Sequence, residues 1–501
     1  MRKLETGLSL DLEGSSQNGQ VADMSVALIA SETRTFDRKA QDDFAFFSAD
    51  RNPIHLDAVQ ARRTQAGQPV VHGMHTVLWA LDVIARNQAL RPVTQLKVEF
   101  QKLIYVGDQV TLEIISQNDA GIRLELSVDG LLVTSLKLTF GEARLEIDRM
   151  GCTPAVHEHS WPSEPRELSF EQMGQASGWL SFARSVGPLA NFFPAAAAAL
   201  GASRVAALAC MSRQVGMVCP GLHSIFSGFT VNLASQSDAM FFEVTSVDER
   251  FRLIEQSVEG GGWSGTIESF ARHPPVLQPR VKHLAQFVRT NEFQQASALI
   301  IGGSRGLGEL TAKLIAAGAG AVTITYAVGR ADALEIQRQI RDWGGLCEVI
   351  PYDATQPAEN QLHSLKRAPA SLYYFATPPI ARRKTNLYAP SVLNDFLRVY
   401  ADGFHDLVQW LLRAPGARLS AFYPSSIAVK ERPAEMTEYA MAKAAGEVLC
   451  KDLARFRKGL RVVVERLPRM LTDLTATVVP VETADPLDVM LPIVRRVETA
   501  D

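Results

Sequence analysis

The sequence has little cysteine and no excess of basic side chains. Its 501 residues include five cysteines, an odd number without a C-x-x-C pair. This predicts reduced structural thiols in a cytoplasmic protein rather than a disulfide framework. Lys and Arg number 51 against 54 Asp and Glu, a net charge of -3. Neither this balance nor any polybasic run favours binding to nucleic acid or to a membrane surface.

Long uninterrupted apolar runs are also missing. The first residues, MRKLETGLSLDLEG, reach acidic side chains before any long apolar region, unlike a signal peptide. An alanine-rich stretch from Pro194 to Cys210 is interrupted by Gly201, Ser203 and Arg204. It is shorter than the roughly 20 apolar residues of a membrane span. We therefore expect this stretch to form a buried helix.

The chain length predicts about two to four domains. Residues 1–148 and 149–275 each place an apolar helix before long alternating runs, which are typical of half-buried antiparallel strands. This order predicts an α+β fold with an internal duplication, in which a sheet wraps around a helix. A Pro-containing stretch marks a linker at 276–292. Over 293–501, apolar runs alternate with helical stretches and predict an α/β fold with a doubly wound parallel sheet.

A loop in the first region carries the motif Asp50-Arg-Asn-Pro-Ile-His55. An Asp and a His at this spacing on a loop can point into one pocket, hold a water molecule and move its proton. Gly73 opens an apolar helix, where its backbone N–H can stabilise negative charge on a thioester oxygen. The alternative is an ordinary capped turn, with Asp50 as the N-cap and His55 at the surface.

The stretch from FAFFSADRNPIHLD through PVVHGMHTVLWALDVIA to FQKLIYVGDQVTLEI resembles the MaoC-like (R)-specific enoyl-CoA hydratases, a family of hotdog folds. The resemblance implies that Asp50 and His55 are the catalytic pair and that Gly73 is the oxyanion donor. The second region lacks the motif and resembles the degenerate half of a double hotdog, which shapes an acyl-chain tunnel. We interpret His75 and His223 as structural side chains, and we predict no metal site.

The third region begins with a strand, a glycine-rich turn and a helix in SALIIGGSRGLGEL. Such glycines let the backbone approach a pyrophosphate, whose charge the helix N-terminus favours. The predicted contacts to a dinucleotide in this turn are Gly302, Ser304, Arg305, Gly306, Leu307 and Gly308.

Two arginines favour NADPH over NADH as this dinucleotide. No acidic residue follows the next strand, AVTITY, and Arg330 lies there instead. An acidic residue at that place would bind the ribose 2′-hydroxyl of NAD, whereas Arg305 and Arg330 suit a 2′-phosphate. The alternative is that both are solvated surface arginines. Asp353, at the end of the CEVIPYD run, suits an adenine contact.

A Tyr439-x-x-x-Lys443 pair places both side chains on one face of a helix. A nearby ammonium lowers the pKa of a phenol, so we expect Tyr439 to exchange a proton with a substrate oxygen near neutral pH. Lys443 can also hold the nicotinamide ribose. Ser426 ends an apolar run shortly before this helix and can hydrogen-bond the same carbonyl.

These features resemble the short-chain dehydrogenase/reductase superfamily, which has a Rossmann fold. The resemblance implies that Thr472, in LPRMLTD, approaches the nicotinamide amide. Three positions depart from the family pattern: the usual Asn-Asn-Ala-Gly is FATPPI, the usual helical Asn is Tyr400, and the Gly after Pro468 is Arg469. The lost Asn belongs to the proton relay behind Lys443, so an impaired reductase is an alternative.

Both resemblances concern 3-hydroxyacyl thioesters, and together they are similar in content to the peroxisomal multifunctional enzyme of β-oxidation with the module order reversed. They imply a bifunctional 3-ketoacyl-thioester reductase and (R)-3-hydroxyacyl-thioester dehydratase or enoyl hydratase. Its cofactor would be NADP, with NAD less favoured, and its substrates would be thioesters of CoA or acyl carrier protein. A homo-oligomer is also expected. Two alternatives stay open: a single-activity enzyme with one scaffold module, and a non-catalytic thioester-binding protein.

Overall fold

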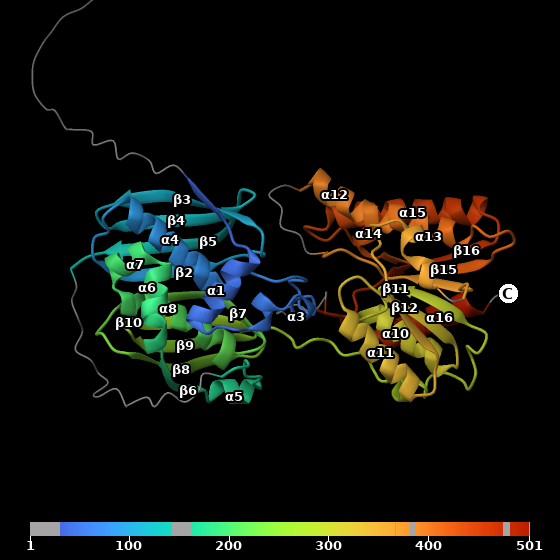
Figure 1. The fold of residues 1–501 in the computed structure, drawn as a ribbon, viewed down its shortest axis with the longest axis horizontal. Helices are drawn as coiled ribbons and strands as arrows, with labels where there is room; N and C mark the ends of the chain where they lie inside the picture. Colours follow the sequence, from blue (N-terminus) through green and yellow to red (C-terminus); the bar gives the residue numbers. More distant parts are fainter. Residues whose placement is uncertain (1–30, 143–161, 366, 381–386, 474–480, 500–501) are drawn as a thin grey trace, which may run out of the picture.

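The fold consists of an antiparallel body and a parallel body joined by one connecting segment (Figure 1). The computed structural model describes residues 31–142, 162–365, 367–380, 387–473 and 481–499. The predicted boundary between residues 148 and 149 lies outside the described residues.

The first half of the antiparallel body wraps five strands around a central helix. Helix α1 (Arg38–Ser48) begins at its N-cap Asp37, whose side chain accepts from the Ala40 N–H. The central helix, α4 (Gly73–Asn87), is buried along most of its length. Its strands are β1 (Glu32–Thr35), β2 (Val93–Phe100), β3 (Gln109–Asn118), β4 (Gly121–Val128) and β5 (Leu131–Phe140). A turn at Asp129-Gly130 joins β4 to β5, with positive φ at both residues.

The second half repeats this arrangement. Its strands are β6 (Ser177–Ser181), β7 (Ser224–Leu233), β8 (Ala239–Asp248), β9 (Leu253–Gly260) and β10 (Trp263–Ala271). A short helix, α5 (Phe170–Gly174), precedes them and has a capping box at Ser169. Strands β2 and β7 pair antiparallel, so the halves form one sheet in the order β1-β3-β4-β5-β2-β7-β10-β9-β8-β6. One apolar core joins the helices of both halves, which confirms the predicted α+β double hotdog.

The single buried helix predicted across the alanine-rich stretch is wrong. The chain forms α6 (Ala183–Phe192), α7 (Pro194–Leu200) and α8 (Ala202–Arg213), followed by the π-helical turn η1 (Gln214–Val218). Pro194 begins α7, and Gly201 separates α7 from α8 with a φ of 97°. Pro stops the preceding helix because its ring clashes with the previous turn, and a positive φ is open mainly to glycine. The burial itself is confirmed, because α8 is buried from Val205 onward.

Among the described residues, no single helix has the length and apolar composition to cross a membrane. The bent pair formed by α7 and the α8–η1 helix passes that test, with an angle of 112° between its parts.

The parallel body has six strands, all parallel, in the order β13-β12-β11-β14-β15-β16. They are β11 (Ser297–Ile301), β12 (Ala321–Tyr326), β13 (Cys347–Pro351), β14 (Ser371–Tyr374), β15 (Leu419–Ser426) and β16 (Leu460–Leu467). The strand order reverses between β11 and β14, where doubly wound sheets bind ligands beyond their carboxyl ends. The predicted Rossmann fold is thus confirmed.

Helices cover both faces of this sheet (Figure 1). On one face lie α10 (Gly306–Ala317), α11 (Arg330–Asp342) and α16 (Pro486–Glu498). On the other face lie α12 (Pro390–Leu397), the π-helical turn η4 (Arg398–Gly403), α13 (Phe404–Leu411) and α15 (Thr437–Phe456). Short segments are η2 (Ala358–Asn360), η3 (Leu362–Ser364) and α14 (Ala428–Glu431).

The segment predicted as a linker contains a helix, α9 (Val281–Leu284), and contributes to the parallel body. Val281, Leu284 and Val288 are buried in the same apolar core as α10 and α16. Two other short helices, α2 (Pro53–Leu56) and α3 (Ala58–Ala61), carry the chain from the hydratase-like motif toward the parallel body (Figure 1).

Candidate active sites

The motif loop is held by contacts to both halves of the antiparallel body. Helix α1 ends at Ala49, which has a left-handed φ of 59°, and the chain turns there toward Asp50. Asn52 caps α2 by accepting from the Ile54 N–H. Its amide nitrogen donates to the carbonyl oxygens of Gly216, at 2.8 Å, and Gly221, at 3.1 Å. The second half of the body therefore fixes the loop that bears Asp50 and His55.

Asp50 is buried against helix α8 and the η1 turn. The Ser212 hydroxyl donates to its Oδ2 at 2.6 Å, and the Asn52 N–H donates to its Oδ1 at 3.2 Å. A Cβ on Gly216 would lie 2.5 Å from Oδ1, so this carboxylate needs glycine at position 216. Burial raises the pKa of Asp50 above its usual range, and His55 followed by Ser212 opposes that rise. The Asp50 carboxyl therefore keeps its proton to a higher pH than an exposed carboxyl.

The orientation of His55 is set by the main chain. Its Nδ1 lies 2.8 Å from the carbonyl oxygen of Val70, so Nδ1 bears the hydrogen and Nε2 keeps its lone pair. Burial lowers the pKa of His55, although Asp50 opposes this shift. A neutral His55 with a free Nε2 is suited to accept a proton.

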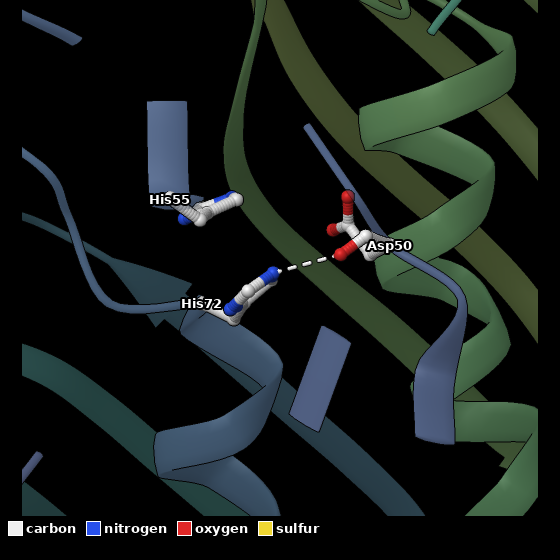
Figure 2. Close-up of side chains that lie close together, drawn as sticks. All are labelled: Asp50, His55 and His72. Carbon is white, nitrogen blue, oxygen red and sulfur yellow. Dashed lines mark hydrogen bonds between the residues drawn. The ribbon is translucent and has the colours of Figure 1, made fainter. Parts of the chain in front are cut away.

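His72 completes a cluster with Asp50 and His55 (Figure 2). Its ring stacks on the His55 ring with centroids 3.8 Å apart. Its Nε2 lies 3.1 Å from the main-chain oxygen of Asp50, and its Nδ1 lies 2.9 Å from Oε1 of Gln41. Burial, followed by His55, lowers the pKa of His72 well below its usual range. His72 thus contacts both Asp50 and His55 and helps to hold them in place.

These three side chains also offer ligand atoms within 4.8 Å of one another, close enough for a metal ion. Both ring nitrogens of His72 and Nδ1 of His55 already lie within 3.1 Å of protein oxygens. Asp50 and His55 Nε2 are left, fewer than the three protein ligands of a catalytic zinc site. The donor set fits proton transfer better than metal binding.

Asp50, His55 and Gly73 line one pocket with about 660 Å³ of empty volume, partly open to solvent. Gly73 is the first residue of α4, so its main-chain N–H points outward from the helix N-terminus. A Cβ there would lie 2.8 Å from the Phe100 ring. The other lining residues come from both halves and include Lys102, Thr134, Ser212, Gly216, Ser224 and Phe226.

The other two histidines lie in structural surroundings. The His75 ring stacks on Phe44 with centroids 4.8 Å apart and is fully buried. His223 lies with its Nε2 3.0 Å from Glu167. Neither of them lines the pocket that contains Asp50.

The glycine-rich turn has the tight geometry that a pyrophosphate site requires. Gly302 and Gly306 have φ values of 78° and 56°. A Cβ on Gly302 would lie 3.1 Å from the main chain of Phe375, and a Cβ on Gly308 would overlap the Gly302 carbonyl oxygen. Ser304 is buried and Leu307 packs on the core below α10. The turn and the α10 N-terminus therefore fit a dinucleotide pyrophosphate.

The other predicted cofactor residues lie along the same edge of the sheet. Arg305 donates to the main-chain oxygen of Arg62 and is mostly buried, whereas Arg330 is exposed at the start of α11. Asp353 follows β13 and accepts from the Thr355 N–H and hydroxyl. Thr472 lies in the loop after β16. Arg62 belongs to the antiparallel body and was not predicted as a neighbour of Arg305.

Helix α15 brings Tyr439 and Lys443 together, close to Ser426 at the end of β15. Lys443 Nζ donates to the Pro424 carbonyl oxygen at 2.8 Å and lies 5.8 Å from the centre of the Tyr439 ring. Burial lowers the pKa of Lys443 to about 7. The predicted lowering of the Tyr439 pKa is wrong, because burial raises that pKa and the hydrogen bond with Ser426 only opposes the rise. A buried ammonium that readily loses its proton cannot provide the expected stabilisation.

Tyr400 occupies the place where the family pattern has Asn. It lies in the η4 turn, fully buried, with its ring centre 3.7 Å from Lys443 Nζ. Its hydroxyl lies 2.5 Å from the Thr377 hydroxyl, and its carbonyl oxygen accepts from the Tyr423 hydroxyl at 3.1 Å. Aromatic side chains thus fill the space behind Lys443 that a polar relay would need.

Fold and site geometry together define a hotdog body with an acid–base pair joined to a Rossmann body with a dinucleotide turn. Residues 20–134 match the family model described as "MaoC like domain". This matched stretch is thus similar to MaoC-like domains. No curated protein matches the chain.

Solved structures similar to the parallel body include three complexes with NADP or NADPH. A putative short chain dehydrogenase from Escherichia coli CFT073, complexed with NADPH, is 19% identical with a TM-score of 0.38, covering 42% of this chain and 94% of its own. A short chain dehydrogenase from Burkholderia cenocepacia J2315, in complex with NADP, is 22% identical with a TM-score of 0.35, covering 41% of this chain and 91% of its own. FolM alternative dihydrofolate reductase 1 from Brucella canis, complexed with NADP, is 16% identical with a TM-score of 0.33, covering 36% of this chain and 76% of its own. Likeness at this level says nothing of substrate or activity.

Several residues of the hydratase-like site escaped prediction. Ser212, Gly216 and His72 contact the Asp50–His55 pair, yet only His72 is close to the motif in sequence. The segment VVHGM shows His72 directly before Gly73, which was a usable signal. Ser212 and Gly216 lie in the second half and carry no motif of their own.

Proposed function

We propose that this chain is a bifunctional 3-ketoacyl-thioester reductase and (R)-3-hydroxyacyl-thioester dehydratase or enoyl hydratase. The convergence of Asp50, His55 and Gly73 in one pocket supports the proposal most strongly. The substrates would be thioesters of CoA or of an acyl carrier protein. Lys102 at the same pocket is suited to bind their phosphates.

In the hydration direction, the proposed cycle starts with a protonated Asp50 and a neutral His55, the state that burial favours. His55 Nε2 removes a proton from water as the oxygen attacks C3 of the enoyl thioester. The Gly73 N–H stabilises the negative charge that develops on the thioester oxygen. Asp50 delivers its proton to C2, and the proton on His55 then returns to Asp50. Dehydration follows the same steps in reverse.

For the reductase, the glycine-rich turn would hold the pyrophosphate of NADPH, which when bound supplies a hydride to a C3 carbonyl. The Tyr439 hydroxyl donates a proton to the carbonyl oxygen, and Ser426 orients that oxygen by a hydrogen bond. Lys443 lies behind Tyr439 and donates a hydrogen bond to the Pro424 carbonyl oxygen of strand β15.

A hydratase with an inactive reductase scaffold is the second candidate. The observation that favours it is the aromatic environment of Lys443. The Tyr400 ring is in contact with the Lys443 ammonium, and the Tyr400 carbonyl oxygen already accepts a hydrogen bond from the Tyr423 hydroxyl. These contacts leave less room for the proton supply that Tyr439 needs after each turnover.

Two assays on the purified full chain test the proposal. Crotonyl-CoA hydration is followed by loss of the enoyl thioester absorbance, and acetoacetyl-CoA reduction by NADPH consumption. Asp50→Asn is expected to lower the hydration rate by about 10²- to 10⁴-fold and to leave the reduction rate unchanged. Tyr439→Phe is expected to lower the reduction rate by a similar factor and to leave the hydration rate unchanged. Hydration without any NADPH consumption would support the hydratase alone. Full hydration by Asp50→Asn would remove the acid–base assignment, and retained crotonyl-CoA binding with no wild-type turnover would indicate a binding protein.

A further inference from the structure

The chain just after α3 contacts the predicted nucleotide end of the Rossmann body. Arg62 and Arg63 both pair with Asp332, in the first turn of α11, and the distance from Arg63 Nη2 to Asp332 Oδ1 is 2.6 Å. From the glycine-rich turn, Arg305 donates to the carbonyl oxygen of Arg62. Figure 1 shows α3 between the two bodies. Two arginines of the MaoC-like body thus meet the arginine predicted to select NADPH.

Gly329 shows where the Arg62 side chain lies. This glycine is buried between the end of β12 and the start of α11, and a Cβ on it would overlap the Arg62 guanidinium. In doubly wound folds the adenosine ribose lies beyond the end of this second strand, where an arginine accommodates a 2′-phosphate. Arg330, the residue predicted for this role, is exposed. Arg62 covers the position instead, from another domain.

The cluster contains more positive than negative charge. Arg62, Arg63 and Arg305 face two carboxylates, Asp332 and Asp473, and Arg305 lies 3.9 Å from Asp473. The three arginine side chains are only 12%, 19% and 22% exposed. Another nearby acid, Glu309, pairs with Lys313 at 2.5 Å.

Two further observations indicate capacity for another anion. The Nε atom of Arg62 is buried and has no hydrogen-bond partner within the described part of the chain. Burial, followed by repulsion from Arg62, lowers the pKa of Arg305 to about 10. A phosphate dianion would satisfy guanidinium donors and offset this repulsion, since phosphate and guanidinium form charge-assisted, often bidentate hydrogen bonds.

We propose that Arg62 and Arg63 act with Arg305 to bind the 2′-phosphate of NADPH, so that the MaoC-like body supplies part of the cofactor specificity of the Rossmann body. The inference rests on the proposed reductase function, because it assumes that the glycine-rich turn holds a dinucleotide. In the absence of nucleotide, Asp332 accepts the hydrogen bonds that the phosphate oxygens would share.

Calorimetric titration of the full chain with 2′,5′-ADP and with 5′-AMP tests the role of the arginines without catalysis. The two probes differ in the 2′-phosphate. Arg62→Ala and Arg63→Ala are each expected to weaken 2′,5′-ADP binding by about tenfold and to leave 5′-AMP binding unchanged. Arg62→Lys, which keeps the charge but not the fork, is expected to recover part of the loss. Arg338→Ala, an exposed arginine on α11, is the matched control.

The outcomes separate the two levels of the proposal. Wild-type protein that binds neither probe would overturn the nucleotide site itself. The wild type could prefer 2′,5′-ADP over 5′-AMP while both alanine variants show an equal or greater preference. That result would overturn the role of the arginines but not the nucleotide site. Equal loss of both probes would show that Arg62 and Arg63 only hold the bodies together. Thermal unfolding of each variant checks that the fold is intact.

Discussion

Replacement of Ser212 by alanine is expected to change the acidity of Asp50 in the proposed catalytic pair. The Ser212 hydroxyl donates to the buried Asp50 carboxyl at 2.6 Å. A hydrogen bond to a charged group contributes about 1.5–3 kcal/mol, and each pKa unit corresponds to about 1.4 kcal/mol. Because Ser212 stabilises the ionised form, its loss should raise the Asp50 pKa by about one to two units above its already raised value.

The measurement is the pH profile of crotonyl-CoA hydration. In the proposed cycle Asp50 acts in its protonated form, so the rate falls as the pH rises through the Asp50 pKa. In Ser212→Ala this falling limb should move to higher pH. Stability changes in a related way: at pH values above the Asp50 pKa the variant loses the hydrogen bond to the charged carboxylate, whereas at low pH the loss is smaller.

Ser185→Ala is the matched control, because Ser185 is also buried in the second half but does not line the pocket. It should leave the falling limb in place. A Ser212→Ala variant with an unshifted limb, even at a lower rate, would refute the assigned effect of Ser212 on Asp50. A limb that moves to lower pH would contradict the role of Asp50 as the proton donor.

Two more perturbations follow from the structure. Gly216→Ala places a Cβ 2.5 Å from Asp50 Oδ1, so hydration should fall by about 10²-fold, whereas Gly187→Ala, which meets no atom within 4 Å, should be silent in the same assay. Lys443 has a folded pKa of about 7 against an ordinary 10.5, so wild-type stability should rise with pH between these values. The free energy of unfolding, measured in urea at pH 7 and pH 9, should differ less between the two pH values in Lys443→Met than in the wild type. An equally large difference in the variant would contradict the burial of the Lys443 charge. Lys451→Met, on the exposed side of α15, is the control.

Periodicity alone predicted most of the fold. The runs SALII and AVTITY correspond residue for residue to β11 and β12. The error at the alanine-rich stretch has a local cause, because apolar composition predicts burial but does not show where a helix breaks. Pro194 and Gly201 were visible, yet whether they bend or end a helix depends on what packs against them.

The site was predictable only where its residues share a stretch of sequence. Asp50, His55 and Gly73 belong to one local motif, and the structure brings them to one pocket. Ser212 is far along the chain from Asp50, and no local pattern relates the two residues. The Tyr439 pKa was mispredicted for a different reason, since spacing reveals the neighbouring ammonium but not the burial that outweighs it.

The hydrogen bonds from Asn52 to Gly216 and Gly221 limit which changes the second half of the antiparallel body can accept. The second half has no acid–base motif, yet its main chain anchors the loop that bears one. Substitutions there would alter the proposed hydration without changing Asp50 or His55. A segment limited to residues 31–142 would retain the motif but lose the contacts that the second half makes with the motif loop. The proposed hydratase activity would therefore be retained only where both halves are kept together.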